Sequence, residues 1–214
     1  MLIATHDGSF HADETTACAI ISYLYDNCTF IRSRDPQELE KADIILDVSG
    51  INDERHFDHH SKEFTLERAN GIKYATAGLM WKKFGIAFLK KAAQNSFETA
   101  PAEEILCRAF ERIDKEVMQL IDLDDNGQLT EHLDKLAKTA TPREDAIKDS
   151  LCDFMQSIPS IPYLVAMMNV AKQNSEAQDK NFLTIVKILK TLLINAAVHA
   201  IDTENGIAKV IEAY

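Results

Sequence analysis

The pattern of apolar residues changes near residue 70, and this change constrains the fold more than any other feature. Before it, short apolar runs of strand length alternate with stretches of helical spacing, and after it almost every segment has helical spacing. The short runs cover residues 2–4, 29–32, 44–46 and 56–58. Strands that alternate with helices favour a parallel sheet. We therefore expect an α/β protein with a parallel sheet flanked by helices, followed by a mostly helical C-terminal half.

Helical spacing also predicts where the helices lie. The first is expected over residues 13–25, and a second begins at Asp35, an N-cap residue that is followed by a proline. The predicted helices of the second half cover residues 76–84, 103–121, 131–138, 141–157, 163–173, 179–200 and 206–214. We expect a domain of residues 1–140 with a helical extension of residues 141–214 packed on it, or one domain of residues 1–214.

The chain is acidic. Its 214 residues carry 23 Lys and Arg against 34 Asp and Glu, a formal net charge of −11. This balance argues against a broad basic face for duplex nucleic acid. It does not exclude a phosphate substrate, because bound metal ions can supply positive charge. No apolar run reaches the ~18 residues of a membrane span, and the N-terminus lacks the features of a secretory signal. We expect a cytoplasmic protein with no membrane partner.

The histidines are concentrated near the N-terminus, with five of the seven in the first 60 residues. His6, Asp47 and His59 each follow a different predicted strand. The carboxyl ends of parallel strands lie at one edge of a sheet, where ligands bind, so these side chains are expected to meet. A single histidine or aspartate in such a place is more often structural. The complete set fits that interpretation poorly.

Four segments carry these side chains: residues 5–14, 46–50, 55–60 and 121–127. Imidazole and carboxylate ligands without cysteine suit Mn, Fe or Zn better than Ca. Two such ions ~3.5–4 Å apart, bridged by a carboxylate, would hold a phosphate and activate water. The sequence therefore predicts a two-metal site for phosphate chemistry.

Six motifs occur in a fixed order between residues 2 and 130. They are Thr5-His6-x-Gly8-x-Phe10-His11-x-Asp13-Glu14, Arg34-Asp35-Pro36, Asp47-Val48-x-Gly50, Arg55-His56-x-Asp58-His59-His60, Ala77-Gly78-Leu79 and Asp122-x-x-Asp125-Asn126-Gly127. This series resembles the DHH phosphoesterase superfamily, and within it the Myg exonuclease family. The resemblance implies a DHH-type metal-binding domain.

The resemblance also implies metal ligands. His6, His11 and Asp13 match the first metal-binding loop. Asp47 matches the carboxylate that bridges both ions, and His59 matches a further ligand.

Other positions have supporting or undecided roles. His60 matches the imidazole that faces the substrate phosphate, and Asp58 is expected to support the neighbouring histidines. Either Asp122 or Asp125 could be the last ligand. For His56, a role in supporting the ligands and a purely structural role are equally favoured.

The resemblance implies a metal-dependent phosphodiesterase, a 3′→5′ exonuclease acting on single-stranded RNA or short oligonucleotides. Its cofactors would be two divalent metal ions. Mn²⁺ is the favoured ion, and Mg²⁺, Zn²⁺ and Fe²⁺ are the alternatives. A homo-oligomer could complete the substrate site, because the Gly-rich C-terminal segment of typical members is not found in this chain. Two alternatives stay open: a pyrophosphatase or small-molecule phosphohydrolase of the same superfamily, and a non-catalytic metal-binding regulatory protein.

Overall fold

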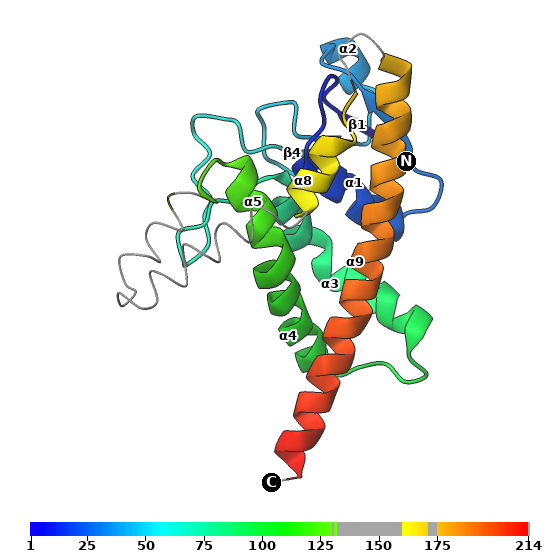
Figure 1. Ribbon diagram of the computed structural model, residues 1–214, viewed down its shortest axis with the longest axis vertical. Helices are drawn as coiled ribbons and strands as arrows, with labels where there is room; N and C mark the ends of the chain where they lie inside the picture. The colour runs from blue at the N-terminus through cyan, green and yellow to red at the C-terminus, as the bar shows by residue number, and fades with distance from the viewer. Residues whose placement is uncertain (130, 132–159, 171–174, 214) are drawn as a thin grey trace.

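A computed structural model describes residues 1–129, 131, 160–170 and 175–213 (Figure 1). Its strands are β1 (Leu2–Thr5), β2 (Thr29–Arg32), β3 (Ile44–Leu46) and β4 (His56–Phe57). They form one sheet in the order β2-β1-β3-β4, and every neighbouring pair is parallel. The predicted α/β fold with a parallel sheet, flanking helices and a helical C-terminal part is confirmed.

The helices account for most of the described chain after β4. They are α1 (Ala12–Leu24), α2 (Pro36–Leu39), α3 (Thr76–Ser96), α4 (Glu103–Ile113), α5 (Gln119–Asp125), α8 (Ile161–Met167) and α9 (Ser175–Glu212), with a π-helical segment at Asp114–Met118. The helix predicted over 76–84 continues to Ser96, because Phe88, Leu89 and Ala92 extend its buried face. The helix predicted over 131–138 lies outside the described residues except for residue 131, and the helix predicted over 141–157 lies outside them entirely.

The last helix corrects a second prediction. The sequence predicted two helices, 179–200 and 206–214, whereas α9 runs without interruption through Gly206. The reason is tertiary: Ile201 is fully buried, and the Glu204 carboxylate forms ion pairs with Arg108 and Arg112 of α4. These contacts offset the cost of about 1 kcal/mol that a glycine adds inside a helix.

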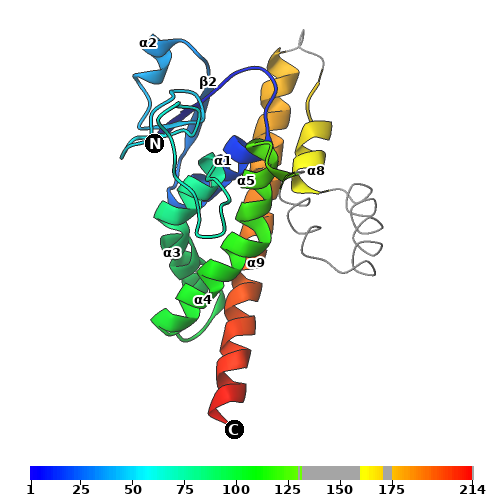
Figure 2. The same ribbon diagram turned by 90° about the vertical axis from the view of Figure 1, so that its left-hand side faces the viewer.

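One apolar core joins the two parts of the chain. Helix α1 packs against both α3 and α9, and its residues from Ala12 to Ile21 are all buried. The core continues from Ile3 in the sheet through Trp81 and Phe88 of α3 to Phe182 of α9. Figure 2 shows α4 and α9 side by side, with the last turns of α9 extending beyond the other elements.

Helix α9 is also distinctive in composition. Among the described residues it is the one helix whose length and apolar content would allow it to cross a membrane. In the structure, its apolar side chains at Phe182, Ile185 and Leu189 are buried against the core. Core helices of globular domains commonly pass the same test.

Candidate metal centre

The end of β1 supplies the first histidine. His6 directly follows Thr5 and is almost fully buried. Its Nδ1 donates a hydrogen bond to the Asp7 carbonyl oxygen at 2.9 Å. This bond turns Nε2 toward two carboxylates: the distance to Glu14 Oε1 is 3.3 Å and the distance to Asp47 Oδ2 is 3.6 Å.

The end of β3 supplies a central carboxylate. Asp47 has a φ of 57°, in the left-handed region that non-glycine residues seldom adopt. Its N–H donates to the Phe57 carbonyl oxygen at 2.9 Å, which holds this turn against β4. Asp47 Oδ1 then lies 3.5 Å from His59 Nε2 and 3.2 Å from His60 Nδ1. Strained backbone of this kind is concentrated at functional sites.

The end of β4 supplies the two adjacent histidines. The His59 ring has Asn126 Oδ1 3.2 Å from Nδ1 and Asp125 Oδ2 2.9 Å from Nε2. His59 Nε2 is buried and has no hydrogen-bond partner, although it faces carboxylates. Asp58 accepts hydrogen bonds from the His60 N–H and Nδ1 and, through its other oxygen, from the Gly50 N–H. Asp58 therefore fixes His60 and the turn after Asp47.

Two carboxylates near the end of α5 have opposite environments. Asp125 lies next to His59, while the Asp122 carboxylate accepts hydrogen bonds from Arg68 Nη1 at 2.6 Å and from the Gly78 N–H at 3.0 Å. A Cβ atom on Gly78 would lie 2.0 Å from Asp122 Oδ2, so only glycine permits this approach. Burial raises the pKa of Asp122 to about 6, against the lowering effect of Arg68. The structure brings Asp125, and not Asp122, to the histidines.

Of the remaining predicted residues, Asp13 and His11 lie in the cluster of candidate ligands and His56 lies outside it. Asp13 is fully buried, with Oδ2 3.8 Å from His59 Nε2, and its two oxygens accept the Thr76 and Ala77 N–H groups at the start of α3. His11 lies at the start of α1, beside His6. His56 instead pairs with Asp53 at the surface, at 2.9 Å, and belongs to no group of candidate ligands in the described chain.

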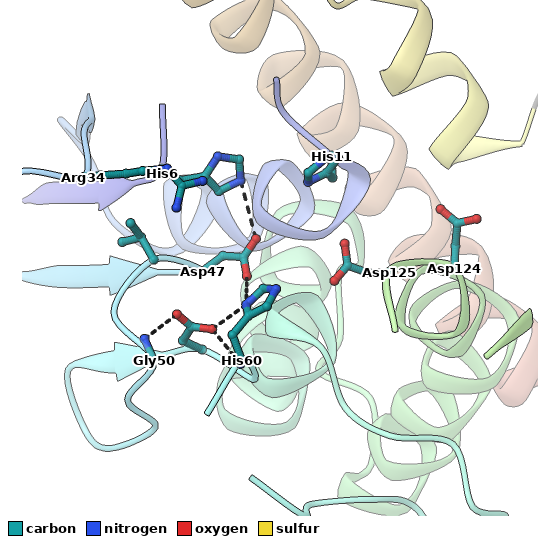
Figure 3. Close-up of a pocket in the computed structure, with 10 residues that line it drawn as sticks. His6, His11, Arg34, Asp47, Gly50, His60, Asp124 and Asp125 are labelled. Atoms are coloured by element: carbon teal, nitrogen blue, oxygen red, sulfur yellow. Dashed lines mark hydrogen bonds and ion pairs between the residues drawn. The ribbon is translucent and has the colours of Figure 1, made fainter. Parts of the chain in front are cut away.

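Three groups of candidate ligand atoms result, each with its atoms within 4.8 Å of one another. The groups are His6, His11, Glu14 and Asp47; Asp47, His59 and His60; and Asp13, His59 and Asp125. They adjoin a cavity of about 540 Å³, whose walls also include Arg34 and Asp124 (Figure 3). The structure thus has acidic and imidazole clusters that could bind metal ions.

Sequence reasoning missed Glu14. This carboxylate is fully buried, accepts the His11 N–H at 2.9 Å and lies beside His6. The available signal was its position next to Asp13 in the first turn of α1, where an acidic residue is readily interpreted as a helix cap.

The electrostatics show why this cluster needs positive charge. Burial, with repulsion from Asp125 and Asp47, raises the pKa of Asp13 well above its usual value, and burial and Asp47 do the same for Glu14. Burial opposes the charge on His59, but the adjacent carboxylates of Asp125 and Asp47 raise its pKa to about 11. Asp47 and Asp58 raise the pKa of His60 to about 9. Without cations, imidazole protons balance the carboxylates.

Divalent ions would fit this set of donors. Imidazole nitrogens and carboxylate oxygens are suitable ligands for Mn, Fe and Zn, and ligands must lose their protons to bind. The buried His59 Nε2, which lacks a hydrogen-bond partner and faces Asp13, Asp47 and Asp125, is placed as a ligand atom would be.

Residues from the C-terminal helical part form hydrogen bonds with the loop that carries His6 and His11. The Phe10 N–H donates to Asn169 Oδ1, and Asn169 Nδ2 donates to the Phe10 carbonyl oxygen, both at 2.8 Å. The Gly8 carbonyl oxygen accepts from Gln178 Nε2 at 3.1 Å and from Arg32 Nη2 at 2.6 Å. Asn169 follows α8 and Gln178 lies in α9, so these helices position a loop more than 150 residues away.

Comparisons with known proteins agree with this organisation. A family model described as an uncharacterised protein family (UPF0160), labelled MYG1 exonuclease, matches residues 2–213. The chain is 28% identical over 185 residues to the MYG1 protein of Saccharomyces cerevisiae, which covers 84% of this chain and 50% of that protein.

The mammalian relatives match a shorter part. The chain is 35% identical over 152 residues to the MYG1 exonuclease of Mus musculus, covering 65% of this chain and 39% of the relative. For the MYG1 exonuclease of Homo sapiens the identity is 34% over 136 residues, covering 58% and 35%. The matched regions thus span half or less of these relatives. No solved structure matches. Because the family model covers nearly the entire sequence, the chain belongs to the MYG1 exonuclease family (UPF0160).

Proposed function

We propose that this chain binds two divalent cations and hydrolyses phosphodiester bonds. The observation that carries the proposal is the position of Asp47, whose carboxylate belongs to two of the three ligand groups. One group contains His6 from the end of β1, and the other contains His59 from the end of β4. A carboxylate shared between two sets of ligands is the arrangement that a two-metal site requires.

The chain's own residues have distinct roles in this proposal. His6, His11, Glu14 and Asp47 would hold one ion. His59, which the other two groups share, would hold the second ion together with Asp13, Asp47 and Asp125, whose oxygens lie 2.9–3.8 Å from its Nε2. When bound, such ions bind phosphate oxygens and lower the pKa of a water molecule. The geometry favours Asp125 over Asp122 as the last ligand, because Asp122 is engaged by Arg68.

His60 is the candidate catalytic residue. Its side chain is 61% exposed and lies at the cavity, while Asp58 holds its Nδ1 at 2.8 Å. With Nδ1 fixed, the ring can present Nε2 to the substrate. A protonated His60 would stabilise the phosphate or donate its proton to the leaving oxygen.

The substrate we propose is single-stranded RNA or a short oligonucleotide, degraded in the 3′→5′ direction with Mn²⁺ as the preferred ion. Three observations support it. Mouse and human relatives are named exonucleases. The ordered motifs resemble those of DHH phosphoesterases. A cavity of about 540 Å³ has the size of a site for a small ligand, and the acidic chain lacks a charge balance suited to duplex binding.

A degradation assay tests the proposal. The chain is freed of metal with a chelator, supplied with Mn²⁺ and incubated with an RNA oligonucleotide labelled at its 5′ end. We expect stepwise shortening from the 3′ end with release of mononucleotides. Asp47→Asn and His59→Gln should abolish it, whereas Asp26→Asn, an exposed carboxylate outside the cavity, should retain it.

Other outcomes would identify the alternatives. Hydrolysis of pyrophosphate but not of RNA would indicate a small-molecule phosphohydrolase. Stoichiometric Mn²⁺ binding without turnover of any phosphate ester would indicate a regulatory metal-binding protein. Full activity in both Asp47→Asn and His59→Gln would reject the proposed centre.

A further inference from the structure

Arg34 differs from the other arginines that the structure describes. The structure describes six arginines, and the five besides Arg34 use terminal guanidinium nitrogens to donate hydrogen bonds to protein groups. These five are Arg32, Arg55, Arg68, Arg108 and Arg112. Arg34 has one ion pair in the described chain, in which Nε lies 3.2 Å from Asp7 Oδ1. Its two terminal nitrogens donate to no group within the described residues. The part of the guanidinium that recognises anions is therefore available.

The backbone around Arg34 is fixed, although its side chain is not. The Ser33 N–H donates to the Thr5 carbonyl oxygen at 2.8 Å, which extends the pairing of β2 with β1. On the other side, Asp35 caps α2 by accepting the Gln37 N–H at 2.9 Å. Arg34 is thus presented from a rigid position at the same sheet edge as His6.

This position makes Arg34 part of the cavity wall. Arg34 and His6 lie together at one end of the cavity, and Asp124 and Asp125 lie at the other (Figure 3). Apart from imidazoles, Arg34 is the only cationic side chain among the lining residues of the described cavity. The carboxylates at the opposite end would repel any phosphate that the metal ions do not neutralise.

The existing partner of Arg34 is easily displaced. The side chains of Arg34 and Asp7 are 63% and 60% exposed. Exposed ion pairs of this kind contribute little to stability, so an incoming anion can replace or join Asp7. A guanidinium offers paired donors that match the oxygens of a phosphate.

We propose that Arg34 forms an anion subsite for a second phosphate group of the substrate, next to the one held at the metal centre. This inference rests on the proposed function and deepens it. The preferred substrates would be nucleotide chains with at least two phosphates, and Arg34 would determine specificity by lowering KM without taking part in bond cleavage. The chain of phosphates would run from the metal ligands toward β2.

Matched dinucleotides test this subsite. A dinucleoside monophosphate carries only the scissile phosphate, and the same compound with an added 5′- or 3′-phosphate carries two. With Mn²⁺, we expect wild-type KM to be about tenfold lower for at least one two-phosphate substrate, the effect of one charged hydrogen-bonded contact. Arg34→Gln should reduce this preference to within about twofold by raising KM for the two-phosphate substrate.

Two further variants separate the subsite from general effects. Arg34→Lys keeps the charge and should retain part of the preference, because it lacks the paired donors. Lys41→Gln removes an exposed positive charge outside the cavity and should retain the preference in full. Equal changes of KM for one-phosphate and two-phosphate substrates in Arg34→Gln would overturn the subsite.

A binding measurement keeps this test independent of turnover. The probe is a methylphosphonate-linked dinucleotide with the same terminal phosphate, titrated by calorimetry into Mn²⁺-loaded wild type and Arg34→Gln. Weaker binding in the variant, with unchanged Mn²⁺ affinity, supports the subsite even if the wild type hydrolyses nothing, in which case the proposed function fails alone. Equal binding in the two proteins overturns the subsite.

Discussion

The N-terminal α/β region and the C-terminal helices contribute to the candidate metal centre in different ways. All candidate ligands in the described chain come from residues 6–125, at strand ends and helix ends. The described residues after 159, which are 160–170 and 175–213, supply none of them. Asn169 and Gln178 nevertheless hold the loop between His6 and His11. One part of the chain therefore supplies the candidate ligand atoms, and another part helps to fix the position of the loop that carries two of them.

The largest expected effect separates the two carboxylates within the N-terminal region. Asp125→Asn should lower Mn²⁺ affinity by more than ~100-fold, because even supporting residues of metal sites cost ~10–100-fold when lost. Asp122→Asn should instead lower the free energy of unfolding by about 3 kcal/mol, since it removes one partner of a buried ion pair. Calorimetric metal titration and urea denaturation measure the two effects. The reverse assignment of effects would show that Asp122 is the ligand.

The next effect tests the contribution of the C-terminal helices. Asn169→Leu leaves the Phe10 N–H and carbonyl oxygen without their partner, so the loop loses its fixed position. We expect Mn²⁺ affinity to fall by ~10–100-fold, as for other residues that orient metal ligands, and amide exchange at Phe10 to accelerate.

Asn181→Leu is the matched control for this variant. Asn181 donates to the Met168 carbonyl oxygen at 2.8 Å, and no hydrogen bond joins it to the described loop between His6 and His11. Unchanged Mn²⁺ affinity in Asn169→Leu would mean that the loop keeps its position without the C-terminal helices.

A smaller effect should appear with pH. In the metal-free protein the pKa of His59 is raised to about 11, so this imidazole is protonated at neutral pH. A cation must displace that proton, and Mn²⁺ affinity should therefore rise with pH, by about tenfold per pH unit for each proton released. Titrations in buffers of different ionisation enthalpy count the protons. Binding that is independent of pH would show that His59 is already neutral.

The smallest effect concerns the C-terminal region alone. Gly206 is exposed inside α9, and an added Cβ would meet no atom within 4 Å. Gly206→Ala should raise the free energy of unfolding by up to about 1 kcal/mol. Gly127→Ala is the control of opposite sign, because Gly127 has a φ of 64°. If Gly206→Ala left the stability unchanged, the continuity of α9 would be in question.

The sequence predicted the fold and the strand-end residues well because both depend on local pattern. Short apolar runs alternating with helices indicate a parallel sheet, and residues that directly follow its strands, such as His6, Asp47 and His59, must lie at one edge. The structure places His6 Nε2 3.6 Å and His59 Nε2 3.5 Å from the two oxygens of the Asp47 carboxylate.

The choice between neighbouring acids could not be predicted, because it depends on distant residues. The Asp122 carboxylate accepts a hydrogen bond from Arg68, more than 50 positions earlier in the sequence. It also packs against Gly78, where any side chain would clash with it. The continuation of α9 past residue 200 depends likewise on Arg108 and Arg112 of another helix. The pairing of Asn169 with Phe10 has no local signal, since 159 residues separate them.

That amide pairing has a thermodynamic consequence. Coupling between two events in one molecule is reciprocal. If the docked helices favour the ion-ready shape of the loop, occupancy of the loop must in turn favour docking by the same factor. Cation supply would then govern how readily α8 and α9 detach and how fast proteases cut there. If the proposed cations bind this loop, metal starvation would therefore shorten the lifetime of the chain.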